Sequence, residues 1–176
     1  MRIEKDNALI NDNAMLIKNS EDHINCCPFC GASENFFTDK AIEFNMGKLS
    51  NSEIKILDHA MKLEVFNGDF YKEAAKKAID KEVKEMFKAL ANIEFMHANI
   101  HRRLGGFEQL PKLKKIDYSS YDNDMLLLNL AGKREEHAVA YYNKYIDEIE
   151  NKNIIPIFKV LSEVENQHIK LLKQPV

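Results

Sequence analysis

The chain has 176 residues, of which 45% are hydrophobic and 30% are charged, and its formal net charge is -3. This composition is typical of one ordinary folded domain with a small additional segment, and the interspersed charges favour neither nucleic acid nor an anionic membrane as a partner. The sequence has no basic head before an apolar run and no stretch near the roughly 18 apolar residues that span a bilayer, so we expect a cytoplasmic protein without a membrane anchor.

Residues 1–49 show no sustained helical pattern and contain the sequence Cys-Pro-Phe-Cys-Gly. The three cysteines, Cys26, Cys27 and Cys30, are too crowded for a disulfide framework, and such spacing is more typical of metal or redox chemistry in a reducing compartment. With His23 they could bind iron or zinc, two chains could pool their Cys27 and Cys30 pairs, or the segment could be a relic, which is the interpretation we favour.

The first helical pattern begins at a capping box, Ser50 to Glu53, and extends to about Ile79. Its inward positions recur at steps of three and four. They are Ile54, Leu57, Met61, Glu64, Gly68, Tyr71, Ala75 and Ala78.

The second pattern follows Asp80 as N-cap and ends at Gly105 and Gly106. Its inward positions are Val83, Phe87, Leu90, Glu94, His97, His101 and Leu104. Ionisable side chains therefore interrupt a face on which apolar residues are expected.

A connection from Gly105 to about Ser120 is too long for a simple hairpin and indicates a bundle with one long crossover. The third pattern gives Met125, Leu128, Gly132, Glu135, Val139, Tyr142, Ile146 and Ile149 as inward positions. The fourth starts near Asn153, tolerates Pro156 in its first turn, and gives Phe158, Leu161, Glu165, His168 and Leu172.

The two halves of this pattern resemble each other at a separation of 71 residues. Identical pairs include Leu57 and Leu128, Lys62 and Lys133, Glu64 and Glu135, Tyr71 and Tyr142, Phe87 and Phe158, Glu94 and Glu165, and His97 and His168. Eleven such pairs over roughly fifty positions exceed the about three expected by chance, so we predict two related helical hairpins with pseudo-twofold symmetry.

Each half carries one inward glutamate and, 30 residues later, a Glu-x-x-His motif, which places a carboxylate and an imidazole one turn apart on the same helix face. The predicted metal ligands are Glu64, Glu94, His97, Glu135, Glu165 and His168. Four buried carboxylates are costly unless they are protonated or neutralised, and two divalent cations would cancel their charge. Mixed carboxylate and imidazole ligands suit iron or manganese, although zinc could also bind.

The tyrosines Tyr71 and Tyr142 each lie two turns beyond the inward glutamate of their helix. Their hydroxyl groups could donate to a ligand carboxylate on a neighbouring helix and orient it, or could bond elsewhere in the core. His101 could be a donor beside the site, an alternative ligand, or a polar end to the helix face, and we favour the last. The remaining ionisable neighbours are expected to be solvated or flanking: Glu136, His137 and Glu163.

On these motifs the chain resembles the ferritin-like di-iron carboxylate superfamily and, within it, a rubrerythrin-type protein. The motifs that carry the resemblance are Glu135, Ala138 and Tyr142 in EEHAVAYY, Glu64 and Tyr71, Glu94 and His97 in IEFMH, and Glu165 and His168 in VENQH. The sequence CPFCGASENFF is similar to the second metal-binding knuckle of a rubredoxin domain, but residues 1–25 contain no first Cys-x-x-Cys pair. Ala138 stands where peroxide-reducing rubrerythrins typically have a further glutamate.

The resemblance implies an all-α, ferritin-like four-helix bundle at residues 50–176, preceded by a degenerate rubredoxin-like or irregular segment at 1–49. It also implies an oxidoreductase that reduces hydrogen peroxide or dioxygen at a carboxylate-bridged pair of iron ions, with an external electron donor and a homodimeric assembly. The alternatives are a ferroxidase or iron-binding protein, and a structural metal-binding bundle without redox turnover.

Overall fold

The computed structural model describes residues 47–173. Within that range the chain forms four α-helices and no strand: α1 (Asn51–Lys77), α2 (Lys81–Leu104), α3 (Asp124–Ile146) and α4 (Ile154–Leu172). The predicted all-α bundle is therefore confirmed. His23 and the three cysteines lie outside the described residues, so the predicted knuckle and the domain boundary after residue 49 stay predictions.

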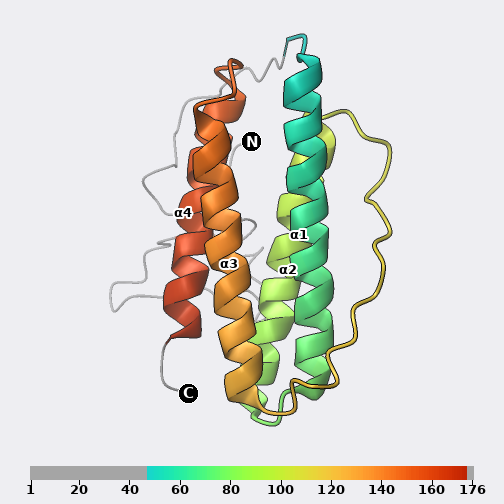
Figure 1. The fold of residues 1–176 in the computed structure, drawn as a ribbon, viewed down its shortest axis with the longest axis vertical. Coiled ribbons are helices and arrows are strands. Elements are labelled where there is room, and N and C mark those ends of the chain that lie inside the picture. Colours follow the sequence, from blue (N-terminus) through green and yellow to red (C-terminus); the bar gives the residue numbers. More distant parts are fainter. Residues whose placement is uncertain (1–46, 174–176) are drawn as a thin grey trace, which may run out of the picture.

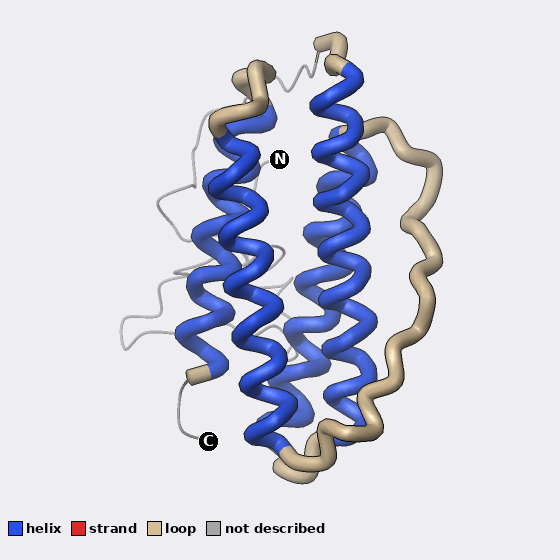
Figure 2. The backbone as a smooth tube through the Cα atoms, in the orientation of Figure 1, coloured by secondary structure: helices blue, strands red, loops and turns tan. Residues whose placement is uncertain are grey.

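The four helices are arranged as two antiparallel hairpins that lie side by side (Figure 1). Helices α1 and α2 form one hairpin and α3 and α4 form the other. The connection from the end of α2 to the start of α3 follows the first hairpin over most of the length of the bundle (Figure 2). This is the long crossover that the sequence predicted, and because of it α2 and α3 run in the same direction.

Helix α1 begins at the predicted capping box. The Ser50 hydroxyl accepts from the Glu53 amide at 3.2 Å, and the Glu53 carboxylate accepts from the Ser50 amide at 2.8 Å. The other oxygen of Glu53 accepts from the amide of Asn151, beyond α3, so Glu53 is buried. Ile54 is 37% exposed, so its predicted inward position was wrong: the carboxylate of Glu53 takes the inward place at this end of the helix.

Helix α3 has a different inward face from the one predicted for its first half. Met125 is 69% exposed, whereas Leu127 and Ala131 are fully buried. The leucines at 126, 127, 128 and 130 supply apolar side chains at successive positions, so the sequence alone does not fix the helix phase there. Further along, Glu135 and Tyr142 are buried as predicted. On α2 and α4 every predicted inward residue is buried.

Two apolar clusters make up the core, and they are separated along every helix by the ionisable residues. One cluster includes Phe70, Phe87, Leu127 and Leu172, and the other includes Leu57, Leu104, Tyr142 and Phe158. The chain positions between them belong to Glu64 on α1, Glu94 and His97 on α2, Glu135 on α3, and Glu165 and His168 on α4. The polar layer is thus closed by hydrophobic side chains on both sides.

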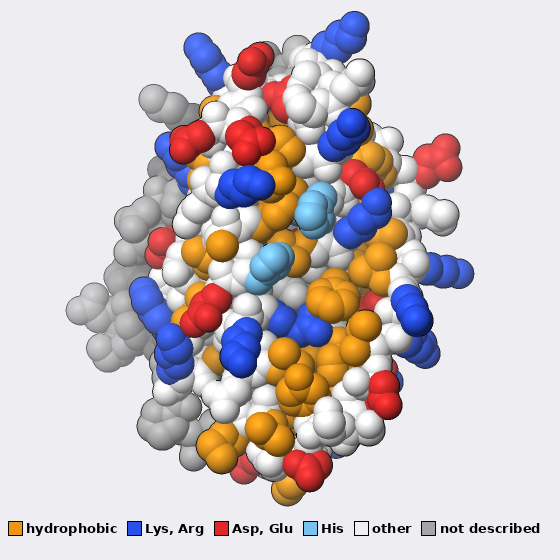
Figure 3. Space-filling view, in the orientation of Figure 1, with side chains coloured by type: hydrophobic (Ala, Val, Ile, Leu, Met, Phe, Trp, Pro, Cys, Tyr) orange, Lys and Arg blue, Asp and Glu red, His pale blue; other side chains and the backbone are white. Residues whose placement is uncertain are grey.

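The crossover is fixed to the bundle by Tyr118, which is 7% exposed. Its ring packs edge-on against Phe70 of α1, with ring centroids 5.3 Å apart, and its hydroxyl accepts from the Arg134 guanidinium of α3 at 2.8 Å. The same guanidinium lies over the rings of Phe66 and Phe70. On the face that α1 and α3 present, lysine and arginine side chains are interspersed with acidic ones rather than gathered in one patch (Figure 3).

Phenylalanine in place of Tyr118 is expected to destabilise the protein by about 2 kcal/mol, because the buried Arg134 cation loses a hydrogen-bond acceptor. Urea denaturation of both proteins measures the change. Tyr121→Phe is the matched control on the same crossover, since its ring packs against Tyr118 but its hydroxyl makes no hydrogen bond within the described residues. Equal effects of the two substitutions would contradict the role of the Tyr118 hydroxyl.

Candidate metal centre

The six predicted ligands meet inside the bundle. Each of the four helices contributes to the set, and every member is at most 5% exposed. Their ligand atoms fall into two groups whose members lie within 4.8 Å of one another: Glu64, Glu94, His97 and Glu165, and Glu94, Glu135, Glu165 and His168. None of the described helices is long and apolar enough to cross a membrane.

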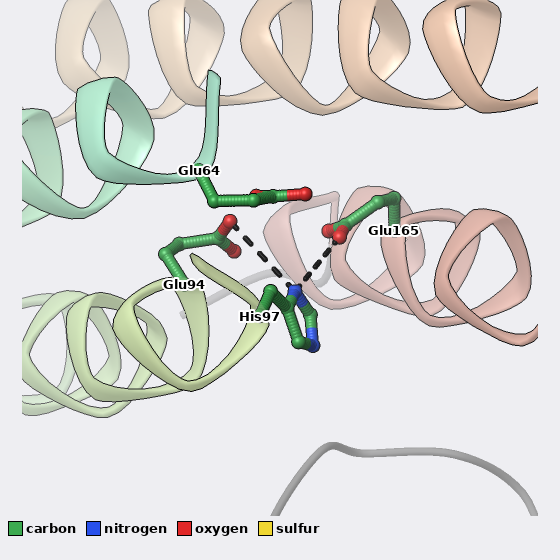
Figure 4. Close-up of side chains that lie close together, drawn as sticks. All are labelled: Glu64, Glu94, His97 and Glu165. Carbon is green, nitrogen blue, oxygen red and sulfur yellow. Dashed lines mark ion pairs between the residues drawn. The ribbon is translucent and has the colours of Figure 1, made fainter. Parts of the chain in front are cut away.

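The two groups share the carboxylates of Glu94 and Glu165, which come from α2 and α4. Figure 4 shows the first group, in which the carboxylates of Glu64, Glu94 and Glu165 converge from three helices and His97 forms ion pairs with Glu94 and Glu165. The helical spacing produces this arrangement, because each Glu-x-x-His motif directs its two side chains to the same side of its helix. Because these two carboxylates belong to both groups, each of them could contact two ions.

The two imidazoles present their Nδ1 atoms to the carboxylates. The Nδ1 atom of His97 lies 3.0 Å from Glu165 Oε1 and 4.0 Å from Glu94 Oε2. The Nδ1 atom of His168 lies 2.8 Å from Glu165 Oε2 and 3.3 Å from Glu94 Oε1. The two rings are nearly parallel, with an interplanar angle of 14°. The two distances between helices are similar, at 3.0 and 3.3 Å, whereas the two within a helix differ, at 4.0 and 2.8 Å, so the site departs from an exact twofold.

Most of the carboxylate oxygens make no hydrogen bond with another described residue, although the Glu165 oxygens lie 3.0 and 2.8 Å from imidazole nitrogens. Both oxygens of Glu94 and of Glu165, and one oxygen each of Glu64 and Glu135, are buried without a hydrogen-bond partner. Each unpaired buried polar group costs about 1–3 kcal/mol, and more if it is charged. Oxygen atoms that converge without donors are the donor set that divalent cations require, so the residues fit two metal ions.

Burial raises the pKa of three of the four carboxyl groups. The pKa of Glu94 is raised to about 8 and that of Glu135 to about 7, with the negative charge of Glu165 as the second cause in both. Burial and the same charge raise the pKa of Glu64 well above its usual range. Without metal, these carboxyl groups hold protons near neutral pH.

Glu165 is the exception and acts as the anion of the metal-free site. Burial alone would raise its pKa, but His97 and His168 outweigh this effect and hold the pKa of Glu165 well below its usual range. In return the Glu165 carboxylate overcomes the effect of burial on the two histidines and raises the pKa of each. The metal-free centre is therefore held by one carboxylate between two imidazolium groups.

The two buried tyrosines make reciprocal hydrogen bonds between the hairpins. The hydroxyl of Tyr71 on α1 donates to Glu135 on α3, and the hydroxyl of Tyr142 on α3 donates to Glu64 on α1. The hydrogen bonds to carboxylates on neighbouring helices that the sequence suggested are present. In each carboxylate the tyrosine holds one oxygen in place, and the other oxygen makes no hydrogen bond within the described residues.

Of these two tyrosines, only Tyr142 is hydrogen-bonded to His101. The Nε2 atom of His101 lies 2.8 Å from the Tyr142 hydroxyl oxygen. A neutral His101 with its proton on Nε2 would donate to the Tyr142 hydroxyl while that hydroxyl donates to Glu64. Burial lowers the pKa of His101 to about 3, which keeps the ring neutral. His101 is thus hydrogen-bonded beside the site, and its role as a donor there stays a prediction; 71 residues later the chain has Leu172.

One polar residue near the site was not singled out from the sequence. Asn67 lies one turn beyond Glu64 and is 1% exposed, and neither atom of its amide has a hydrogen-bond partner in the part of the chain that the structure describes. Its position on the inward face of α1 was visible in the sequence, but its lack of a partner was not. Glu136 and His137 are exposed and Glu163 is half-buried and accepts from Gln167, so these three flank the site as predicted.

Comparison with known proteins agrees with this architecture. A family model described as a ferritin-like domain matches residues 52–175. A solved structure of a hypothetical protein from Pyrococcus furiosus superposes with a TM-score of 0.58 at 24% sequence identity, covering 70% of this chain and 87% of that one. This similarity concerns the fold. No curated protein matches the sequence.

Proposed function

The chain belongs to the ferritin-like family, and from this premise we propose that it is a rubrerythrin-like oxidoreductase. Two metal ions, which we propose to be iron, would lie in the polar layer between the hairpins. The substrate would be hydrogen peroxide or dioxygen, and an external donor would return the electrons.

One observation carries the proposal. Four carboxylates and two imidazoles from four helices converge in an interior closed by apolar clusters, and six of the carboxylate oxygens have no hydrogen-bond partner. Without metal, protonation of three carboxyl groups and the pairing of Glu165 with two imidazoles compensate only part of these costs. Two bound metal ions would compensate the rest.

The symmetry of the site suggests which residues would hold which ion. Glu64 and His97 would bind one ion and Glu135 and His168 the other, while the two shared carboxylates would contact both. Carboxylate and imidazole ligands in this proportion favour iron or manganese. Two ferrous ions would supply two electrons, and with two protons from water these break the O–O bond of hydrogen peroxide and give two water molecules.

The protein would orient the ligand side chains and keep bulk water away from the metal ions. Tyr71 and Tyr142 hold Glu135 and Glu64 in fixed orientations across the interface between the hairpins. His101 holds the Tyr142 hydroxyl in the orientation that donates to Glu64. Phe87 on one side and Phe158 on the other, both fully buried, separate the layer from solvent along the axis of the bundle.

The rubrerythrin type and the external electron donor are proposed from the sequence motifs. The set of four glutamates, two histidines and two tyrosines supports the rubrerythrin type. The amino-terminal segment has one of the two Cys-x-x-Cys pairs that a rubredoxin domain uses, so we propose that an external redox protein is the electron donor. A cytoplasmic homodimer is the assembly we expect.

Anaerobic reconstitution with ferrous iron, followed by removal of excess metal, tests the metal site directly. We expect about two irons per chain in the native protein. His97→Ala should lower iron affinity by at least the 10- to 100-fold that loss of a residue supporting a metal ligand typically costs. The control is His137→Ala, because His137 is an exposed histidine of the same bundle. No iron in the native protein would contradict the proposal.

Mixing the reduced, iron-loaded protein with hydrogen peroxide or dioxygen tests the reaction. Oxidation should be much faster than that of free ferrous ion at the same concentration, and repeated cycles should occur when a chemical reductant is present. Rapid oxidation that releases ferric iron from the protein would instead indicate iron handling. Retention of metal without any oxidation would indicate a structural bundle.

A further inference from the structure

Asn67 breaks the symmetry of the metal centre. It lies between Glu64 and Tyr71 on α1 at steps of three and four residues, so the three side chains share the inward face of the helix. All three are at most 1% exposed. The residue 71 positions later is Ala138, which lies between Glu135 and Tyr142 on α3 in the same way.

The amide of Asn67 has hydrogen-bonding capacity that the fold does not use. Its Nδ2 atom can donate two hydrogen bonds and its Oδ1 atom can accept two, and neither atom has a partner among residues 47–173. Buried polar side chains in folded proteins are normally paired, so an exception on the inward face of a metal centre calls for a ligand. The alanine at the equivalent position shows that the fold itself requires no polar group there.

We propose that Asn67 binds the substrate through its amide and makes hydrogen peroxide, rather than dioxygen, the preferred oxidant of the Glu64 half of the site. This inference rests on the proposed function and names the substrate of that same centre. Hydrogen peroxide carries O–H donors and oxygen acceptors, so it pairs with both atoms of an amide. Dioxygen has no donor and is a poor acceptor, so it gains little from Asn67.

The chemistry of the two halves supports this placement. The half that contains Asn67 also contains Glu64, which is oriented by Tyr142 and through it by His101. The other half has Ala138 and Leu172 at the equivalent positions. Added hydrogen-bonding groups thus gather on one side of an otherwise symmetric ligand set, which is the arrangement needed to receive a polar substrate on that side.

The test uses Asn67→Ala, which copies Ala138, and Asn67→Leu, which keeps a similar side-chain shape without polar atoms. In the iron-loaded, oxidised protein, azide is the probe, because its terminal nitrogen accepts a hydrogen bond. We expect both variants to bind azide about 5- to 10-fold more weakly, as the loss of one hydrogen bond predicts. The rate with peroxide relative to the rate with dioxygen should fall by a similar factor.

A third readout does not depend on metal. In the metal-free protein both variants should be at least as resistant to urea as the native chain, because they remove an amide without a partner. Asn99→Ala is the matched control, since its amide donates to the Phe95 carbonyl and accepts from Arg102. It should leave azide affinity and the ratio of rates unchanged.

Two results would overturn the inference while the proposed function stands. One is native azide affinity and an unchanged ratio of rates in iron-loaded Asn67 variants. The other is a loss of metal-free stability in Asn67→Leu, which would mean that the fold itself supplies partners for the amide. Failure of the native protein to bind iron is a separate result, which overturns the proposed function and this inference together.

Discussion

Glutamine in place of Glu165 is expected to destabilise the metal-free protein by about 3 kcal/mol, whereas glutamine in place of Glu94 should leave its stability unchanged or raise it. Glu165 lies 3.0 Å from Nδ1 of His97 and 2.8 Å from Nδ1 of His168, and it is the anion that keeps both imidazoles charged. Its removal leaves two buried imidazoles without a counter-ion. The cost stays near the low end of the range for broken buried pairs because the imidazoles can release their protons.

Glu94 differs because burial raises its pKa to about 8, so the carboxyl group is mostly protonated at neutral pH. Glutamine is then a close substitute for a neutral carboxyl group. Urea denaturation at pH 7 in the presence of a chelator measures both changes, and Glu136→Gln is the exposed control. Similar stabilities of the Glu165 and Glu94 variants would contradict the assignment of Glu165 as the buried anion.

The same two variants should behave alike once metal is offered. Each removes a carboxylate that belongs to both groups of ligands, so each should lower iron content. A residue that destabilises the metal-free protein when replaced is acting as an ion-pair partner, and a residue whose replacement lowers only metal content is acting as a ligand. Comparison of the two measurements separates the roles of Glu165 and Glu94.

The stability of the metal-free protein is expected to fall as the pH rises from about 5 to about 8, by about 1 kcal/mol per pH unit or more. Between the usual carboxyl pKa and the raised values of about 8 for Glu94 and about 7 for Glu135, the folded state binds more protons than the unfolded state. This contribution is present below the unfolded pKa and is lost as pH rises through the folded one. The raised pKa values of His97 and His168 act in the same direction.

His101 opposes this trend at the acidic end only. Burial lowers its pKa to about 3, so below about pH 6.5 the unfolded state takes up a proton that the folded state refuses. This single group favours folding as pH rises, but the carboxyl groups outnumber it. The stability of the protein with chelator should therefore decline over the whole range.

With metal bound the pH dependence should reverse. Ligand carboxylates and imidazoles must lose their protons to bind an ion, so metal affinity and the stabilisation that follows from it rise with pH. Urea midpoints at pH 5.5, 6.5 and 7.5, measured with chelator and with zinc as a probe without redox chemistry, give the two trends. Parallel trends would show that the six residues do not bind the ion.

The sequence correctly placed the six ionisable residues together, because they recur at helical steps of three and four on their helices. Their role as metal ligands stays a prediction. On α2 and α4 every predicted inward residue is buried, although apolar side chains such as Phe95 and Met96 also lie between the inward positions. The repeat at 71 residues then assigned Glu135 rather than Glu136 on α3, and the structure buries Glu135 and exposes Glu136.

The errors have physical reasons. The first half of α3 has leucines at successive positions, so the packing of the hairpins, rather than the pattern, selects Leu127 and exposes Met125. Ile54 is displaced from the core because Glu53 is held inward by its bonds to Ser50 and Asn151. The unpaired amide of Asn67 could not be inferred from a sequence, because the lack of a partner appears only when every neighbour is placed.

The crossover explains how the two halves can differ. Each hairpin alone carries one glutamate, one Glu-x-x-His motif and one tyrosine, so two identical hairpins would already assemble the six ligands and both reciprocal tyrosine bonds. Identical subunits, however, must change together, and any residue gained by one appears in the other. Joining the halves in one polypeptide removes that restriction. It allows Asn67 to occupy the position equivalent to that of Ala138, and His101 the position equivalent to that of Leu172, about an axis that two separate copies would have kept symmetric.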